Sequence, residues 1–184
     1  SNQWLYNTLP FMFNIGSLSL FIAGDLSSMT GSEIILSEAS STGTSKFAYF
    51  AASSGDNMKV YYYPAGVTLD SVIGTGVLSG GEGLIQVEDS GSEIAAGRDG
   101  VIQSPVSYTR AWATVAANRF SLNRHLGFSQ IAGGVWSFSK IAICPQLTEE
   151  QRLIVEAFMM GGGGGGANPN LYNMGLGVNI GIGF

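Results

Sequence analysis

The stretch that decides the fold is residues 118–160, NRFSLNRHLGFSQIAGGVWSFSKIAICPQLTEEQRLIVEAFMM. Within it, residues 120–122 and 135–138 alternate between apolar and polar side chains, which is the period of a strand with one buried face. The second strand continues to Cys144, and Pro145 ends it because proline cannot donate a hydrogen bond to a sheet. This order predicts a strand, a loop, a second strand and then a short helix.

The predicted helix begins just after Pro145. Thr148 is suited to cap its first turn, and Glu150 and Gln151 follow at about the spacing of a capping box. The apolar stripe of the helix is expected to consist of Leu153, Ile154, Ala157 and Phe158.

Upstream of this stretch, short strand-like runs follow one another with turn residues between them. Residues 53–57 predict a hairpin loop, and Arg98-Asp99-Gly100 predicts a tight turn in which glycine supplies the positive φ. About ten strands with almost no helical period before residue 148 predict an all-β fold, a two-sheet antiparallel jelly-roll sandwich with one short C-terminal helix. Strands are expected near residues 18–23, 33–37, 47–51, 58–63, 67–74, 83–88, 92–96, 112–115, 119–122 and 135–143.

Composition divides the chain into an N-terminal segment (1–10), the sandwich (11–160) and a glycine-rich tail (161–184). The tail opens with a run of glycines and then alternates glycine with larger residues. Ordering such a backbone costs much entropy, so two interpretations stay open: a flexible linker, or an assembly element that packs on a partner subunit. The assembly residues would be Leu176, Val178, Ile180, Ile182 and Phe184.

The composition excludes several classes of function. Of 184 residues 45% are apolar and 11% charged, with a net charge of −5, so the chain is neither disordered nor basic. The eight lysines and arginines are scattered singly, so we expect no nucleic-acid partner. The apolar run 11–23 is too short and too interrupted to span a membrane, and we expect no membrane insertion. Cys144 is the only cysteine, and its apolar strand predicts a buried, unreactive thiol.

Six segments, taken in order, carry a family resemblance: residues 19–23, 33–37, 94–101, 120–124, 133–143 and 147–151. Together they resemble the concanavalin A-like lectin/glucanase superfamily in its laminin-G-like form, and within it the domains carried on bacteriophage tail and virion proteins. The resemblance covers about residues 10–160. It implies a jelly roll that binds glycans on a concave face or at loop tips.

The resemblance further implies a non-enzymatic, extracellular attachment domain of a virion, part of a tail fibre or receptor-binding protein, that binds a host surface glycan. The alternative is a structural decoration or assembly domain that contacts other virion proteins and binds no sugar. In either case we expect a homo-oligomer, with a trimer as the first candidate.

A glycan hydrolase is the weaker alternative. The enzyme branch of the superfamily carries a Glu-x-Asp-x-x-Glu strand whose carboxylates point into one cleft. Here Glu88 and Asp89 are adjacent and would face opposite sides of a strand, and Ser90-Gly91 indicates a turn. His125, the only histidine, has no nucleophile elbow in the sequence to accompany it. We therefore expect no enzymatic activity.

Aromatic residues carry the binding hypothesis, because sugar rings stack on aromatic planes. Tyr49, Tyr61 and Tyr63 are expected on paired strands, with Tyr61 and Tyr63 sharing one face, and Tyr108 and Trp112 in a loop-rich region. Ordinary cross-strand packing is the competing interpretation for each of them. No cofactor is predicted, although calcium is a candidate through the aspartates expected in turns: Asp25, Asp56, Asp70, Asp89 and Asp99.

Overall fold

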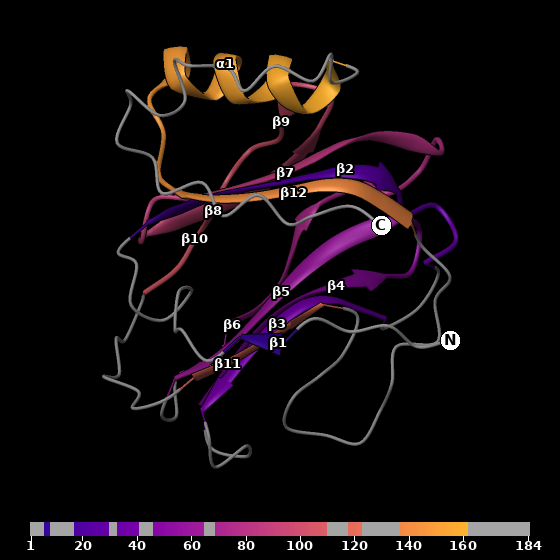
Figure 1. Cartoon of the computed structure of the whole chain (residues 1–184). Helices are drawn as coiled ribbons and strands as arrows, with labels where there is room; N and C mark the ends of the chain where they lie inside the picture. Colours follow the sequence, from indigo (N-terminus) through magenta and orange to yellow (C-terminus); the bar gives the residue numbers. More distant parts are fainter. Residues whose placement is uncertain are drawn as a thin grey trace.

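The computed structural model describes residues 6–7, 17–29, 33–40, 46–64, 69–109, 118–122 and 137–161. These residues form two antiparallel sheets that face each other, and one helix lies on the outer side of one sheet (Figure 1). The jelly-roll sandwich with a short C-terminal helix that the sequence predicts is confirmed. No helix in the described part of the chain is long and apolar enough to cross a membrane.

The first sheet has the strand order β1-β11-β3-β4-β5-β6. Its strands are β1 (Tyr6–Asn7), β3 (Ile34–Ser40), β4 (Lys46–Ser53), β5 (Asn57–Pro64), β6 (Leu69–Gly74) and β11 (Asn118–Leu122). The predicted hairpin at residues 53–57 joins β4 to β5, and Gly55 and Asp56 take positive φ values of 78° and 58° in its turn.

The second sheet has the order β10-β8-β7-β2-β12, with β9 paired to β8. Its strands are β2 (Leu18–Asp25), β7 (Glu82–Asp89), β8 (Glu93–Arg98), β9 (Val101–Ile102), β10 (Val106–Ser107) and β12 (Ser137–Pro145). The predicted tight turn joins β8 to β9, and Asp99 as well as Gly100 has a positive φ there. Strand β12 ends at Pro145, as predicted.

The main core lies between the two sheets and follows the alternation of the strands. Leu20 and Ile22 of β2 meet Phe50 of β4 and Val60 of β5, all of them fully buried. Strand β2 is buried on both faces, because its alternate residues, such as Phe21, point towards the helix. The described part of the apolar run 11–23 is therefore a central strand of the sandwich.

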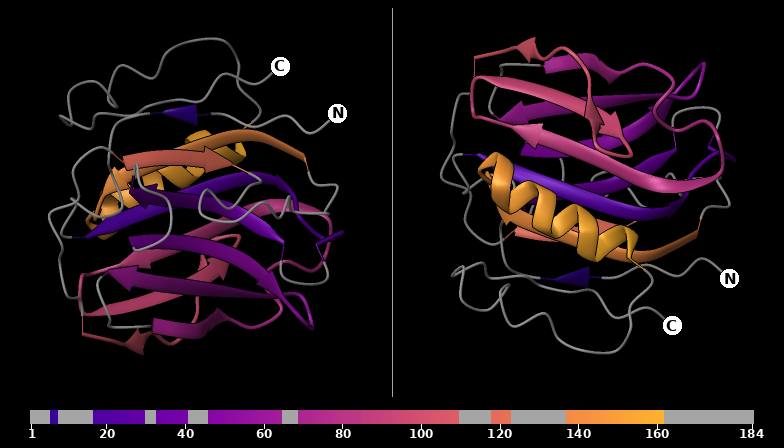
Figure 2. Two further views of the ribbon diagram at one scale, coloured as in Figure 1. Left: turned by 90° about the horizontal axis from the view of Figure 1, so that it is seen from below. Right: turned by 90° about the horizontal axis from the view of Figure 1, so that it is seen from above.

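Helix α1 (Glu149–Met160) lies over β2 and β12 on the outer face of the second sheet (Figure 2). Its capping box is confirmed, because the Thr148 hydroxyl accepts a hydrogen bond from the Gln151 backbone N–H and the Thr148 backbone N–H donates one to the Gln151 side-chain oxygen. At the other end, the Lys140 ammonium donates to the carbonyls of Phe158, Met159 and Gly161, where a cation suits the helix dipole.

The predicted apolar stripe of α1 is partly wrong. Leu153 is 53% exposed and Ala157 is exposed, whereas Ile154 and Phe158 are half-buried. The buried residues are Val155, Glu156 and Met159. The helix is turned in this way because Glu156 meets a buried glutamine of the second sheet, a polar contact that helical periodicity alone does not reveal.

Candidate functional site

The outer face of the first sheet, turned away from the second sheet, carries a row of residues that crosses every strand. The alternation of residues along β4 and β5 puts this row on the outer face. Phe50 and Val60 point into the core, so their neighbours Tyr49 and Tyr61 belong to the outer face. The strand pairing aligns, from one edge to the other, Tyr6, Ser121, Ser37, Tyr49, Tyr61 and Asp70. Hydroxyl-bearing, aromatic and acidic residues thus share one line across the sheet.

The accessible part of this face lies over β5 and β6. Ser37 and Ala51, nearer the centre of the sheet, are each only 1% exposed. In contrast, Tyr61 is half-buried, Asp70 is exposed and Val72 is 43% exposed. A ligand arriving from solvent would therefore meet the side chains of β5 and β6.

The chemistry at this position combines a ring with an ion pair. Asp70 stands directly opposite Tyr61, and the Lys59 Nζ lies 2.9 Å from the Asp70 Oδ1. The aromatic ring offers an apolar plane, the carboxylate accepts hydrogen bonds and the ammonium donates them. This is the combination that a sugar ring, apolar on its faces and hydroxylated at its edge, requires. We call Lys59, Tyr61 and Asp70 the β5–β6 site.

The structure brings together three of the predicted binding residues. Tyr49 is the cross-strand partner of Tyr61, and Tyr63 lies two residues further along β5, on the same face by alternation. Tyr62 belongs to the opposite face, as expected. The prediction missed Lys59, although its spacing of two residues before Tyr61 is a usable signal.

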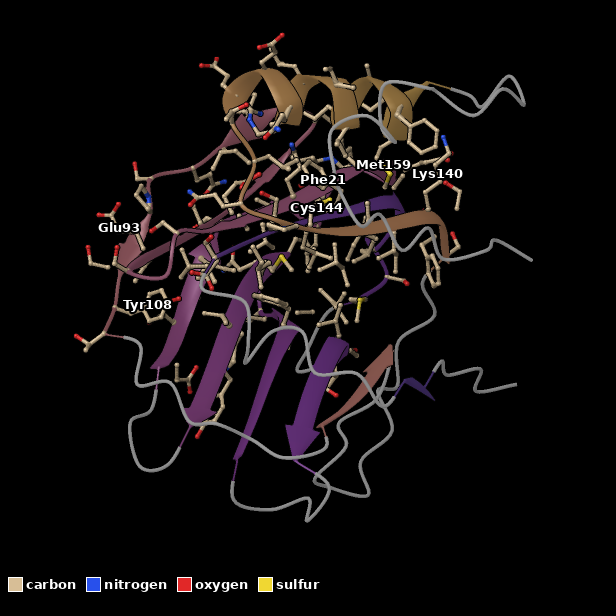
Figure 3. The ribbon with its side chains drawn as sticks, turned by 60° about the vertical axis from the view of Figure 1, so that its left-hand side comes forward. Phe21, Glu93, Tyr108, Lys140, Cys144 and Met159 are labelled. Atoms are coloured by element: carbon tan, nitrogen blue, oxygen red, sulfur yellow. The ribbon has the colours of Figure 1, made fainter. Side chains whose placement is uncertain are left out.

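Tyr108 is separate from this group. It follows β10 on the second sheet, and its hydroxyl donates to the Asp89 Oδ1 at 2.5 Å while its ring packs against the core (Figure 3). Tyr108 therefore braces the edge of the second sheet. Trp112, His125 and the tail residues Leu176, Val178, Ile180, Ile182 and Phe184 lie outside the described residues.

The carboxylates considered for hydrolysis do not share a cleft. Glu88 lies on the outer face of the second sheet, where its carboxylate accepts a hydrogen bond from Ser19. Asp89 follows the core-facing alternation of Val87 and is fully buried. Burial raises the pKa of Glu88 to about 7, against the lowering effect of the Ser19 hydrogen bond. The two groups face opposite sides of β7, as the sequence predicts.

Most of the aspartates considered for calcium bond to other groups of the chain. Asp25 accepts hydrogen bonds from the Ser27 hydroxyl and backbone, and these bonds lower its pKa. Asp99 accepts from the Leu84 backbone. Asp70 lies within β6, and Asp25 and Asp89 are the last residues of β2 and β7, so the prediction that these three aspartates stand in turns is wrong. Among the described residues, no three His, Cys, Asp or Glu side chains are grouped so that they could hold a metal ion.

Comparison with known sequences is uninformative, since no family model and no curated protein matches this chain. Solved structures do match. The CBM40 domain of the Ruminococcus gnavus IT-sialidase, bound to α2,6-sialyllactose, is 9% identical with a TM-score of 0.57, over 78% of this chain and 84% of that one. Mouse laminin α1 domains LG4–5 are 13% identical with a TM-score of 0.59, over 79% of this chain and 40% of that one.

A third match is the binding domain of botulinum neurotoxin DC in complex with rat synaptotagmin II, which is 8% identical with a TM-score of 0.57, over 86% of this chain and 40% of that one. Domains of this kind are lectin-like jelly rolls, so the similarity supports the fold predicted from the sequence. At these identities it concerns the fold alone, and function has to be argued from this chain's own residues.

Proposed function

We propose that this chain is a non-enzymatic binding domain that recognises a glycan at the β5–β6 site and serves to attach a virion to its host. The observation that carries the glycan proposal is the position of Tyr61 beside the Lys59–Asp70 ion pair on an accessible sheet face. The half-buried Tyr61 ring offers stacking area, and Asp70 and Lys59 supply an acceptor and donors for hydroxyl groups.

The comparisons give this proposal further support. The similar CBM40 domain is bound to sialyllactose, so a sandwich of this shape is compatible with glycan binding. The virion setting, the extracellular location and the tail-fibre context depend on the sequence resemblance and are part of the same proposal.

The second candidate is an assembly domain that binds other virion proteins or further copies of this chain and no sugar. The alternation of apolar residues in 176–184 favours it. The similar neurotoxin domain is in complex with a protein, so this fold is also compatible with protein partners. Glycan hydrolysis is the weakest candidate, because Glu88 and Asp89 face opposite sides of β7.

A glycan array with the intact chain tests the first proposal. If the β5–β6 site binds sugar, Tyr61→Ala should weaken binding to any positive glycan by about tenfold or more, since it removes the stacking plane. Tyr108→Phe is the matched control: it alters the other predicted aromatic site and should leave affinity unchanged. An array without any positive glycan, or equal loss in both variants, contradicts the proposal.

The assembly candidate has its own measurement. The solution mass of the intact chain is compared with that of a chain ending at Met160. An oligomer that becomes a monomer on truncation supports assembly through the tail and the predicted homo-oligomer. If both chains are monomers, the result contradicts assembly through the tail and the predicted homo-oligomer.

A further inference from the structure

The second sheet holds, on the side of α1, a half-buried acidic group that the proposed binding role does not use. Glu88 of β7 lies on the face that α1 covers, and its Oε2 accepts a hydrogen bond from the Ser19 hydroxyl at 2.5 Å. The Ser19 Oγ in turn accepts the backbone N–H of Leu147, which immediately precedes the helix cap. The chain that leads into α1 is thus tied to Glu88 through one serine.

The other oxygen of the same carboxyl is unsatisfied. Among the described residues, the Glu88 Oε1 is the one buried side-chain oxygen or nitrogen without a hydrogen-bond partner. While the carboxyl is protonated and neutral, an oxygen without a partner costs the docked state little free energy. It costs far more when the group is ionised, because a buried negative charge needs donors to replace water.

The surroundings of Glu88 supply one partly compensating charge, that of Arg152. The neighbours of Glu88 across the sheet are Ser19 on β2 and Ala95 on β8, and the nearby ionisable group on β12 is the Cys144 thiol. From α1, Arg152 and Glu156 act on Glu88 with opposite signs. The Arg152 guanidinium is paired with Glu156, and its attraction offsets only part of the cost of burying an ionised Glu88.

We propose that α1 is a proton-controlled cover, docked on the second sheet while Glu88 is protonated and released from it when Glu88 ionises. Release exposes the apolar strip that the helix buries, formed by Phe21, Ala23, Leu84, Ala142 and Cys144. The two sheets keep their own core, because that core lies on the other side of β2 and β7. The opening is therefore local to α1.

The titration sets the pH range of the opening. Burial raises the pKa of Glu88 from 4.5 to about 7 in the docked state. A carboxyl released to water returns to its ordinary value. The open fraction should therefore rise between about pH 5 and pH 7 and level off above that, because by then both states are ionised.

Cys144 provides the readout. It is the only cysteine of the chain, is 1% exposed and packs beneath Val155 and Met159 of α1 (Figure 3). Labelling of the intact chain by 4,4′-dithiodipyridine is followed from about pH 5 to pH 8, and each rate is divided by that of the urea-unfolded chain. Dividing by the rate of the unfolded chain corrects for the increase in thiol reactivity with pH, so the ratio reports only how accessible Cys144 is. Protection should fall roughly 10-fold between about pH 5 and pH 7.5 and then stay constant.

Two variants separate Glu88 from other causes. Glu88→Gln keeps the shape of the side chain but cannot ionise, so its protection should stay at the low-pH level throughout. Glu93→Gln changes an exposed carboxyl of the same sheet and should follow the wild type. A pH-independent wild type, or a Glu88→Gln chain with the wild-type profile, overturns the proposal.

Hydrogen exchange of the wild type gives an independent measurement that does not depend on any variant folding. After correction for intrinsic exchange, the amides of α1 should lose protection over the same pH range while those of β4 and β5 keep it. Parallel loss in α1, β4 and β5 would mean global unfolding and would refute a local cover.

Discussion

Glu156 of α1 is buried against the second sheet, and replacing it with leucine tests whether polar contacts hold the helix in its position. Glu156 is 8% exposed and Gln86 beneath it is 0% exposed. The Gln86 Nε2 donates to the Glu156 Oε1 at 2.5 Å, and Arg152, one turn earlier in α1, also pairs with that oxygen. Leucine removes the acceptor and leaves the Gln86 amide buried without a partner.

The magnitude follows from these contacts. A hydrogen bond to a charged group contributes about 1.5–3 kcal/mol, and a buried donor left unsatisfied costs about 1–3 kcal/mol. Arg152 is partly exposed and can turn to water, so it adds little. We expect Glu156→Leu to lower the free energy of unfolding by about 2–4 kcal/mol.

Equilibrium urea denaturation followed by circular dichroism at about pH 5 measures this loss. Gln86→Leu should cost a similar amount, because it removes one of the two partners of the Glu156 carboxylate and also the acceptor of the Gly100 N–H. The double variant should be about as stable as either single one, a coupling of about 2–4 kcal/mol. Glu150→Leu, exposed in the first turn, is the control and should stay within about 0.5 kcal/mol. Additive single effects, or a Glu156→Leu loss below about 0.5 kcal/mol, would refute the reasoning.

Three further predictions follow from single features of the fold. The folded state holds the Glu88 proton more tightly than the unfolded chain, so this stabilisation is complete below pH 4.5 and is lost as the pH rises through about 7. The full pKa shift corresponds to about 3 kcal/mol, and the partial exposure of Glu88 reduces the expected loss of unfolding free energy to about 1–2 kcal/mol. Urea denaturation at several pH values should show this loss in the wild type and not in Glu88→Gln. Gly97→Ala places a Cβ 2.2 Å from the Val101 carbonyl oxygen and 2.6 Å from the Ile102 Cα, so the β8–β9 hairpin must separate. A loss of about 2 kcal/mol or more is expected in thermal unfolding, and an unchanged Tm contradicts the close approach of these strands. Lys140→Met removes three hydrogen bonds to carbonyls at the end of α1, and should lower stability by about 1–2 kcal/mol with faster hydrogen exchange in the last turn; unchanged exchange there argues against this cap.

Features that depend on near neighbours in the chain were predictable. Pro145 ends its strand and Thr148 caps its helix because both effects arise from groups within a few residues. The tight turn at Asp99-Gly100 follows from backbone preferences. Alternation along β5 predicted that Tyr61 and Tyr63 share a face, and an apolar strand predicted a buried Cys144.

Features that depend on residues far apart in the chain required the tertiary structure. Ser19 meets Glu88 across 69 positions, and Gln86 meets Glu156 across 70, so neither contact has a local signal. The Gln86–Glu156 contact belongs to an orientation of α1 in which Glu156 is buried and Leu153 is exposed, against the apolar pattern. The β5–β6 site likewise depends on which residue of β6 stands opposite Tyr61. Local sequence therefore determined the strands, the caps and the alternation, whereas strand register and the mutual burial of distant polar groups were decided by packing, because these energies exist only once the sheets have come together.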